Sequence, residues 1–387
     1  MKTEWTWTYP AELEQAWAAI AARMAPGDLS GFEADVARIS NALTTERDPR
    51  FGRYAFDARS LVAYGLFFFP QTYARMVLAL DECLDHDRWR PPVHDGPLRI
   101  LDLGAGAGAA TFAALFSLGR RLEDFAAEVE AADASPEGLR TLAELFDAVA
   151  RPRWPRVGLT CRAADLRVPG EAGTGAYDLV LASFVLNELL EGAPAAAATR
   201  WLDSAASKLA PGGLLVITEP VSRTTSERIE RLRDAVAAAG HLDIVAPCLH
   251  RLPCPLLAAG EVWCHEVRRW PLPDTVSRLN RRLHRQVETV KFSLLAVAHR
   301  APETRGPANA LTARLVAPLH VRKGRITTWG CAADGDVHTY EVQTRSLDRA
   351  AVRAAERIER GARVTWGSLH PLGDQTTLRS DSLPQVE

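Results

Sequence analysis

Four cysteines in the C-terminal part of the chain have the residue type and the clustering of a metal site. Cys248, Cys254 and Cys264 lie close together in a stretch rich in proline and histidine, and Cys331 follows 67 residues after Cys264. Four thiolates can bind tetrahedral zinc, and the same number holds a [4Fe–4S] cluster. The clustering predicts that all four cysteines are ligands of one metal centre. Loop thiols without a metal are the alternative.

The spacing of these cysteines bears on the kind of metal. Five residues separate Cys248 from Cys254 and nine separate Cys254 from Cys264, whereas structural zinc sites usually pair ligands two to four residues apart. Irregular loops can surround an iron–sulfur cluster, and the prolines of this stretch restrict its backbone. The spacing therefore favours a [4Fe–4S] cluster over zinc. His250 and His265 would be ligands only in the zinc alternative.

A glycine-rich turn with spaced acids forms a second candidate site. Leu98–Leu103 predicts a short apolar strand, and the turn Gly104-Ala105-Gly106-Ala107-Gly108 connects it to a helix that begins near Ala109. Glycine suits positions where the backbone approaches a ligand closely. Asp133 ends the next predicted strand, where a carboxylate can bind ribose hydroxyls. This context predicts a ligand crevice at the carboxyl end of the first strand.

Two details favour S-adenosylmethionine over NAD as the ligand of this crevice. Asp102 stands two residues before Gly104, where its charge would repel a pyrophosphate but attract the ammonium group of a methionine moiety. Leu209–Ile217 and Asp178–Leu189 resemble segments of class I methyltransferases. Asp165 follows an apolar stretch and could lie beside the adenine amino group, although a helix cap explains it equally well. The predicted contacts of S-adenosylmethionine are Asp102, Gly104, Gly106, Gly108, Asp133 and Asp165.

The elements that must position these residues alternate between strand and helix. Strands are expected at Glu128–Ala132, Tyr177–Ala182 and Leu214–Thr218, with a helix at Trp201–Leu209 before the last of them. Such alternation is typical of a doubly wound parallel sheet. The fold class is therefore α/β, a Rossmann-like sheet of the class I methyltransferase kind.

The flanking segments have a different texture from the sheet region. Residues 1–97 are expected to form an N-terminal helical region, in which Thr72–His86 is one helix. Residues 98–300 are the Rossmann-like domain, which carries the cysteine-rich loop 247–265. Residues 308–370 are expected to form a small β-rich domain that contributes Cys331, followed by a frayed C-terminal end.

Composition limits the classes of protein to which the chain can belong. Of its 387 residues, 47% are hydrophobic and 24% are charged, which excludes a wholly disordered chain. The net charge of −2 excludes a uniformly basic surface. No run approaches the about 20 apolar residues of a membrane helix, and the first residues lack the apolar stretch of a signal peptide. We expect a cytoplasmic protein with reduced thiols, and neither a membrane nor DNA as a partner.

Basic residues gather in the stretch from Arg268 to Arg325. The stretch holds 13 lysines and arginines against three acids, a local net charge of +10. Arg281, Arg282 and Arg285 have helical spacing and could present one charged face. Cations without compensating acids predict a phosphate-rich partner. A solvated helix face is the alternative.

These motifs together resemble the methyltransferase-like family of mitochondrial small-ribosomal-subunit assembly proteins and its bacterial relatives. The resemblance extends from about Tyr64 to Trp366 and includes Leu101–Thr111 and Glu219-Pro220 with the arginine-rich helix that follows. Its most specific part is the cysteine pattern, in which the motif Pro247-Cys248-x-His250-x3-Cys254-Pro255-Leu256 precedes Trp263-Cys264-His265 and Cys331.

The resemblance implies both cofactors and a partner. It assigns [4Fe–4S] ligand roles to Cys248, Cys254, Cys264 and Cys331, and roles in binding S-adenosylmethionine to the glycine loop with Asp102 and Asp133. It also implies association with the small ribosomal subunit during its maturation, through ribosomal RNA and the basic stretch 268–325. The chain departs from the family's pattern at two points of this loop. Leu249 stands where the family usually has proline, and the interval from Cys254 to Cys264 is about two residues longer.

Three functions follow from these observations. The first is an S-adenosylmethionine-dependent methyltransferase that acts on ribosomal RNA. The second is a non-catalytic assembly factor in which S-adenosylmethionine and an iron–sulfur cluster, or zinc, are structural ligands. A dehydrogenase is disfavoured by the glycine pattern. No catalytic residue can be assigned, because the chain has neither an Asn-Pro-Pro-Tyr-type motif nor a cysteine in a catalytic context. We expect the first function.

Overall fold

Short apolar strands that alternate with helices build the parallel part of a central sheet. The computed structural model describes residues 6–24, 29–41, 57–85, 88–168, 171–173, 175–285, 287–299 and 309–387. The parallel strands are β1 (Leu98–Leu103), β2 (Ala127–Asp133), β3 (Val157–Ala163), β4 (Tyr177–Ser183) and β5 (Leu209–Glu219). The chain reverses direction across the sheet between β1 and β4, and ligands bind at such switch points in doubly wound folds.

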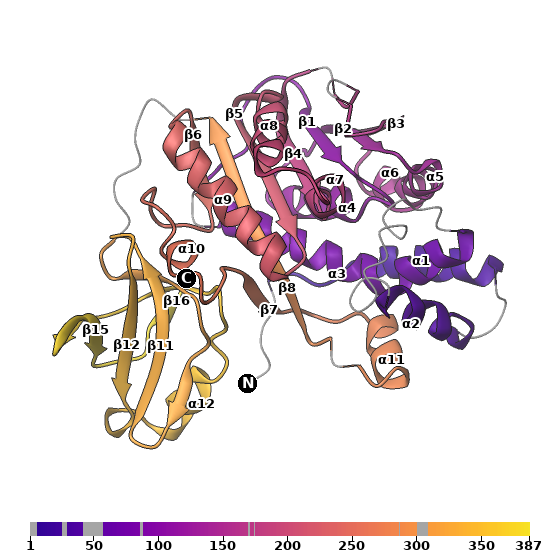
Figure 1. The fold of residues 1–387 in the computed structure, drawn as a ribbon. Helices are drawn as coiled ribbons and strands as arrows, with labels where there is room; N and C mark the ends of the chain where they lie inside the picture. Colours follow the sequence, from indigo (N-terminus) through magenta and orange to yellow (C-terminus); the bar gives the residue numbers. More distant parts are fainter. Residues whose placement is uncertain are drawn as a thin grey trace.

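An antiparallel strand completes this sheet. β8 (Thr289–His299) lies between β5 and β6 (Leu242–Ala246) and runs antiparallel to both, which gives the order β3-β2-β1-β4-β5-β8-β6. β7 (Glu266–Arg269) pairs with the other end of β8 and continues the sheet toward the C-terminal domain (Figure 1). The expected Rossmann-like α/β fold is confirmed by this topology.

Helices cover both faces of the central sheet, as the alternation of buried side chains requires. Leu179 and Leu181 of β4 face one hydrophobic core, while Val180 and Ala182 face the other. The longer helices of the sheet region are α4 (Ala109–Gly119), α5 (Pro136–Leu145), α8 (Ala195–Ala206) and α9 (Arg223–Ala239). The shorter elements are α6 (Arg151–Arg153), α7 (Leu186–Leu189), α10 (Pro255–Ala259) and the π-helical turn Phe146–Ala150.

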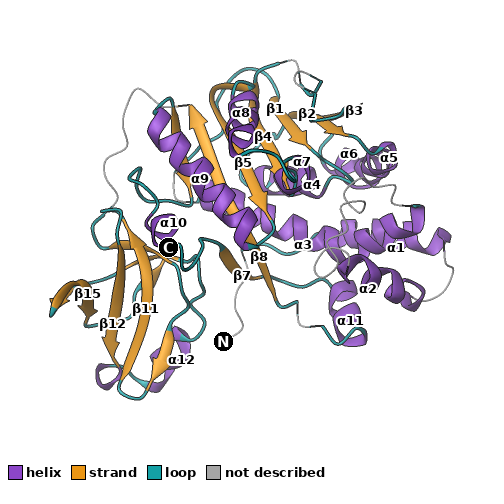
Figure 2. Cartoon of the chain, in the orientation of Figure 1, coloured by secondary structure: helices purple, strands orange, loops and turns teal. Residues whose placement is uncertain are grey.

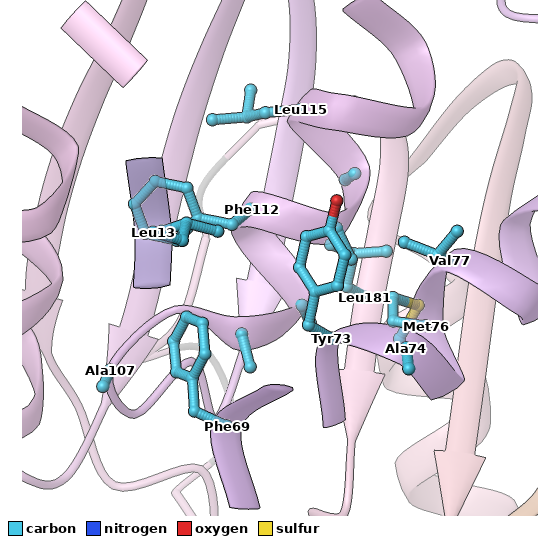
Figure 3. Close-up of a cluster of buried hydrophobic side chains, with 14 of the residues drawn as sticks. Leu13, Phe69, Tyr73, Ala74, Met76, Val77, Ala107, Phe112, Leu115 and Leu181 are labelled. Carbon is cyan, nitrogen blue, oxygen red and sulfur yellow. The ribbon is translucent and has the colours of Figure 1, made fainter. Parts of the chain in front are cut away.

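The N-terminal region is helical, and its long helix packs directly on the sheet domain. Figure 3 shows Phe69, Tyr73 and Val77 in the same cluster as Phe112 and Leu115 of α4. The helices of this layer are α1 (Ala11–Met24), α2 (Glu33–Asn41), α3 (Ala58–Leu84) and α11 (Asp274–Arg282), with a 3-10 turn at Leu29–Phe32. Figure 2 shows these helices gathered beside the strands.

The expected start of the third helix at Thr72 was wrong. α3 begins at Ala58 and continues through Pro70, so the apolar segment before Thr72 is helical. Pro70 lacks the N–H for one helical hydrogen bond. Burial of Phe67, Phe69 and their neighbours on both sides outweighs that loss. His86, the expected last residue, lies outside the described residues.

The C-terminal part of the chain forms a second sheet. Its order is β14-β15-β12-β11-β9-β13-β16, with β10 paired to β11. The frayed C-terminal end was wrong, because β15 pairs in parallel with β12 and gives this segment backbone partners. The elements are β9 (Thr312–Leu315), β10 (His320–Arg322), β11 (Arg325–Ala332), β12 (Val337–Gln343), a 3-10 turn (Thr344–Ser346), α12 (Arg349–Ala355), β13 (Arg363–Thr365), β14 (His370–Leu372), β15 (Asp374–Ser380) and β16 (Gln385–Val386).

A buried cation joins the three parts of the molecule. Arg314 of β9 forms ion pairs with Glu82 of α3 and with Glu266 of β7, at 2.8 Å to the latter. All three side chains are nearly inaccessible to solvent, with exposures of 4%, 9% and 2%. The two carboxylates raise the pKa of Arg314 despite its burial. The guanidinium therefore neutralises two acids from two other parts of the chain.

We predict that Arg314→Ala strongly destabilises the protein. Removal of the cation takes the Arg314 guanidinium away from Glu82 and Glu266, and Arg268, 2.7 Å from Glu266, compensates only one of the two carboxylates. Breaking a buried ion pair from one side costs about 3–5 kcal/mol. Urea denaturation should show this loss, whereas Arg140→Ala should change stability by about 0–1 kcal/mol, because the pair of Arg140 with Glu137 is exposed. Equal stability of the two variants would show that the buried network does not hold the domains together.

Candidate cofactor and metal sites

The glycine-rich turn adopts a backbone that leaves room for a ligand. The backbone φ is +76° at Gly104, +52° at Gly106 and +90° at Gly108. Residues other than glycine rarely adopt such positive φ values. A Cβ on Gly104 would approach Val185 to 2.5 Å, so this glycine is required by packing. A Cβ on Gly106 would meet no atom within 4 Å. The space above Gly106 is therefore open, as close approach of a cofactor requires.

Asp102 lies beneath this turn with one oxygen unsatisfied. The side chain is fully buried, and Thr111 donates a hydrogen bond to its Oδ2 atom at 2.6 Å. Its Oδ1 atom is buried without a hydrogen-bond partner among the described residues. Burial raises the pKa of Asp102 to about 7. An unpartnered buried carboxylate oxygen is costly, and it fits the predicted partnership with the ammonium group of S-adenosylmethionine.

Asp133 holds the tip of the glycine turn. Its two oxygens accept hydrogen bonds from the backbone N–H groups of Gly106, at 2.8 Å, and Ser135, at 2.7 Å. Burial raises the pKa of Asp133. The sequence thus identified a carboxylate that stands at the switch point, at the end of β2 and against the glycine turn. Its contact with ribose hydroxyls stays a prediction.

Asp165 stands in a locally bonded turn. Its Oδ1 atom accepts from the backbone N–H of Arg167 at 3.0 Å, and the side chain of Arg167 lies 3.6 Å from its Oδ2 atom. Glu171 in turn accepts from the backbone N–H of Asp165. The turn after β3 is therefore organised by its own polar groups, and the proposed contact with adenine stays a prediction.

The loop after β4 is an additional part of this region that sequence reasoning only partly identified. Phe184 has a φ of +63°, a strained conformation for a bulky residue. Glu219 at the end of β5 accepts from the N–H groups of Leu186 at 2.9 Å and Asn187 at 3.0 Å. The amide of Asn187 is best oriented to donate to the carbonyl of Phe184 and to Glu219. A buried carboxylate thus fixes the loop that faces the glycine turn.

Side chains of α3 reach the same loop. The Arg75 guanidinium lies over the ring of Phe184, 5.1 Å from its centroid, and its Nε atom donates to the carbonyl of Lys291 at 3.2 Å. Burial, together with the nearby Asp133 and Glu219 carboxylates, raises the pKa of Glu188 to about 8. No local sequence pattern predicts the strained backbone of Phe184. The Glu219-Pro220 pair, in contrast, is recognisable in the sequence.

The four predicted metal ligands come together around one cavity. Cys248, Cys254, Cys264 and Cys331 all line a space of about 650 Å³ between α9, the cysteine-rich loop and the C-terminal sheet, part of it open to solvent. Cys331 lies on β11 of the second sheet and meets His250 of the loop, with 3.3 Å between Sγ and Nε2. The structure therefore brings together thiols that are far apart in sequence.

One helix positions the cysteine-rich loop. Asp234 of α9 accepts from the backbone N–H of Cys254 at 3.0 Å, and Glu230 accepts from that of Cys264. Arg233, one turn from Glu230, donates to the carbonyl of His250 at 2.7 Å. Burial raises the pKa of Glu230 to about 7. Loop residues without regular structure are thus tied to a rigid element at three points.

The chemistry of this donor set suits a metal cluster. Burial raises the pKa of Cys254 to about 11, and it also raises the pKa values of Cys264 and Cys331, with the nearby Cys248 thiol as a further cause in each case. Buried thiols of this kind become thiolates when a metal centre supplies positive charge. Among the described residues, no three His, Cys, Asp or Glu side chains are arranged around a single ion.

The two remaining cysteines lie away from this cavity. The helical segment around Cys83 predicts a buried structural thiol, and Cys83 is fully buried in α3. The apolar strand around Cys161 predicts a core position, and this prediction is wrong because the side chain of Cys161 is exposed. β3 pairs only with β2 at the edge of the sheet, and the second half of the strand is exposed to solvent.

The basic stretch does not form one surface in the described part of the chain. Arg314 is buried, Arg268 donates to the carbonyl of Arg360, and Arg269 pairs with Glu359 at 3.2 Å. Arg282 pairs with Glu33 of α2 at 2.7 Å, and the side chain of Arg285 donates to Ser40. The predicted charged face of Arg281, Arg282 and Arg285 therefore partly serves to hold the N-terminal helices. Arg300 and Arg305 lie outside the described residues.

The strand order, the glycine turn after β1 and the acid at the end of β2 define the fold as that of a class I S-adenosylmethionine-dependent methyltransferase. The chain belongs to the family described as mitochondrial small ribosomal subunit Rsm22, whose sequence profile matches residues 58–371. A search of curated proteins found none that matches the chain. Among the described residues, no helix combines the length and apolar character needed to cross a bilayer.

Solved structures with a similar fold are distant. An S-adenosylmethionine-dependent methyltransferase from Clostridium acetobutylicum is 16% identical, with a TM-score of 0.28, over 41% of this chain and 53% of its own. The chain thus spans about half the length of that relative. A precorrin-6y C5,15-methyltransferase from Geobacter metallireducens is 12% identical over 57% of this chain and 87% of its own, with a TM-score of 0.32. A Listeria monocytogenes protein described as a putative class I methyltransferase is 11% identical over 77% of this chain and 90% of its own, with a TM-score of 0.41.

We predict that Asp102→Asn stabilises the protein while it weakens S-adenosylmethionine binding. The pKa of Asp102, about 7 in the folded protein, exceeds the unfolded value of about 3.9, so ionisation of this group lowers stability as the pH rises from about 4 to 7. The amide avoids this cost and can still accept from Thr111. The free energy of unfolding of Asp102→Asn should exceed that of the wild type by about 1–3 kcal/mol at pH 8 and by little at pH 4.

Calorimetry at pH 8 should show an affinity for S-adenosylmethionine about tenfold lower in Asp102→Asn, because a charge-assisted contact is lost. A variant that loses stability at pH 8, or binds as the wild type does, would contradict the assignment of Asp102.

Proposed function

We propose that this protein is an S-adenosylmethionine-dependent methyltransferase that acts on ribosomal RNA during assembly of the small ribosomal subunit. The observation that carries this proposal is the open, acid-flanked glycine turn, with Gly106 unobstructed and an oxygen of buried Asp102 unpartnered. Membership of a small-ribosomal-subunit family supports the partner. Gly104, Gly106, Gly108, Asp102, Asp133 and Asp165 are the proposed cofactor contacts, and a cytoplasmic location is part of the proposal.

Methyl transfer from a sulfonium requires chiefly that donor and acceptor are held in line. The loop from Phe184 to Glu188 lies at the switch point beside the glycine turn, where the acceptor would enter. Glu219 and Arg75 restrain it from β5 and α3. A general base is not required when the acceptor is electron-rich, so the lack of an assignable base is compatible with an enzyme.

A second candidate function is a non-catalytic assembly factor. The observation that favours it is the role of Asn187, whose amide is engaged by the carbonyl of Phe184 and by Glu219. The polar side chain at this position of the loop therefore serves the loop itself, and it is not free to orient an acceptor base. In this function the cofactor would stabilise the fold.

We also propose a [4Fe–4S] cluster bound by Cys248, Cys254, Cys264 and Cys331. The proposal is supported by the four thiols that line one cavity, and zinc bound by the same thiols is the alternative. A bound cluster would supply the positive charge that stabilises four thiolates. Because Cys331 belongs to the second sheet, the cluster would join that sheet to the loop held by α9.

Gly106→Arg should abolish binding of S-adenosylmethionine. The side chain would occupy the open space above the turn at a φ of +52°. Isothermal titration calorimetry should detect binding of S-adenosylmethionine, but not NAD, to the wild type. The control is Gly240→Arg at the C-terminal end of α9, which also has a positive φ and an open Cβ position, and it should bind normally. Binding to Gly106→Arg equal to that of the control would refute the site.

Transfer of radiolabelled methyl groups to immature small ribosomal subunits decides between the two functions. If the protein is a methyltransferase, the wild type should incorporate labelled methyl groups into RNA and Gly106→Arg should incorporate none. The assembly factor predicts no incorporation, together with binding to the subunit that weakens steeply as salt rises. Failure to bind the subunit at all would reject both functions.

Anaerobically purified protein should contain about four iron atoms and four sulfides per chain. Cys331→Ser should lower the iron content and the folded yield, because metal binding is coupled to folding. The exposed Cys161 provides the matched control, and Cys161→Ser should keep its iron. A colourless, iron-free wild-type protein would eliminate the cluster, and zinc in its place would restore the alternative. An unchanged melting curve of metal-loaded Cys331→Ser would show that Cys331 does not join the domains.

A further inference from the structure

The face of β11 that carries Cys331 also exposes a large aromatic side chain. Along β11 exposed and buried residues alternate, and Ile326 and its buried neighbours face the core of this domain. The opposite face carries Arg325, Trp329 and Cys331, two or four residues apart on the same strand. Trp329 is 44% exposed, whereas Trp366 in the same domain is 1% exposed. A tryptophan on a flat strand is thus presented to solvent beside the cysteine cavity.

Neighbouring side chains hold this aromatic surface and give it positive charge. The ring of His320 on β10 packs against Trp329 edge to face, with 5.7 Å between centroids. Arg322, the last residue of β10, and Lys323, in the turn that follows, are exposed, and neither has an ion pair in the described part of the chain. Both residues lie near the end of the basic stretch, and the internal ion pairs of that stretch leave these two side chains available to a partner.

The carboxylate on this face is already neutralised. Glu341 of β12 lies opposite Thr327 in the register and is 9% exposed. It contacts Arg379 of β15 at 3.1 Å and Arg325 at 3.6 Å. Two cations thus surround one anion, and Arg322 and Lys323 remain in excess. Asp334 and Asp336 lie in the turn at the opposite end of β11, where Asp334 pairs with His338 at 2.7 Å.

We infer that this face binds single-stranded RNA, with an unpaired base stacked on Trp329 and the backbone phosphates near Arg322, Lys323 and Arg325. An exposed aromatic ring on a sheet with adjacent cations is the combination by which proteins bind unpaired nucleic acid. A base within a duplex has no free face for such stacking. The choice of RNA rests on the proposed function, whereas the stacking site is read from the surface itself. Because Cys331 lies two residues from Trp329, the bound strand would cross the rim of the cysteine cavity.

Fluorescence anisotropy of the full-length protein with a labelled 12-nucleotide oligouridine tests this inference. Trp329→Ala should raise the dissociation constant about 5- to 100-fold, the range for loss of one stacked base. Trp329→Phe should retain most of the affinity because it keeps a ring. Val168→Ala, which truncates a 46%-exposed apolar side chain on the sheet domain, is the matched control and should bind normally. Arg322→Ala with Lys323→Ala should reduce the salt dependence of binding.

Calorimetry with S-adenosylmethionine on each variant separates this site from the cofactor site. The affinity of each variant for S-adenosylmethionine should equal that of the wild type. The inference is overturned if Trp329→Ala binds oligouridine as the wild type does, or if a labelled RNA duplex of equal length competes equally well. If wild-type protein binds small ribosomal subunits but not oligouridine, the stacking site is rejected and the proposed function stands. Failure to bind either RNA rejects both.

Discussion

The arrangement of the whole molecule depends on one buried arginine. Arg314 is the register partner of Cys331 across β9 and β11, and it lines the same cavity as the four cysteines. Its guanidinium neutralises Glu82 from the helical layer and Glu266 from β7. Ion pairs of this kind are costly to desolvate but tolerate few alternative geometries. The network therefore sets where the second sheet sits, and with it the position of the thiol that faces the loop.

Carboxylates also fix the backbone around the glycine turn. Partly buried Asp133 and buried Glu219 each accept hydrogen bonds from two backbone N–H groups. The donors to Asp133 are Gly106 and Ser135, and the donors to Glu219 are in the loop after β4. The two carboxylates fix two facing loops without contributing to the hydrophobic core. These polar groups thus fix the loops at the carboxyl ends of the strands, where one oxygen of Asp102 has no hydrogen-bond partner among the described residues.

The local patterns predicted most of the sheet domain, and long-range packing explains what they missed. Residues 98–103 and the glycine turn have a strand and turn signature that depends on near neighbours, and the structure follows it. Pro70 suggested a break that the surrounding core overrides. Arg282 and Arg314 looked like part of a basic surface because their partners Glu33 and Glu82 lie more than 200 residues away in sequence. Arg268 looked unpaired because its partner Glu266 stands two residues earlier, just before the counted stretch begins. The left-handed Phe184 depends on tertiary contacts and has no local signature.

The location of Cys331 orders events during synthesis. The loop with the first three cysteines leaves the ribosome well before β11, and domains generally fold in the order in which they emerge. The cavity stays unfinished until the last third of the chain has been translated and its sheet has docked. Completion of the four-thiol set thus requires synthesis through β11, and a truncated product lacking β11 carries at most three of the four proposed ligands.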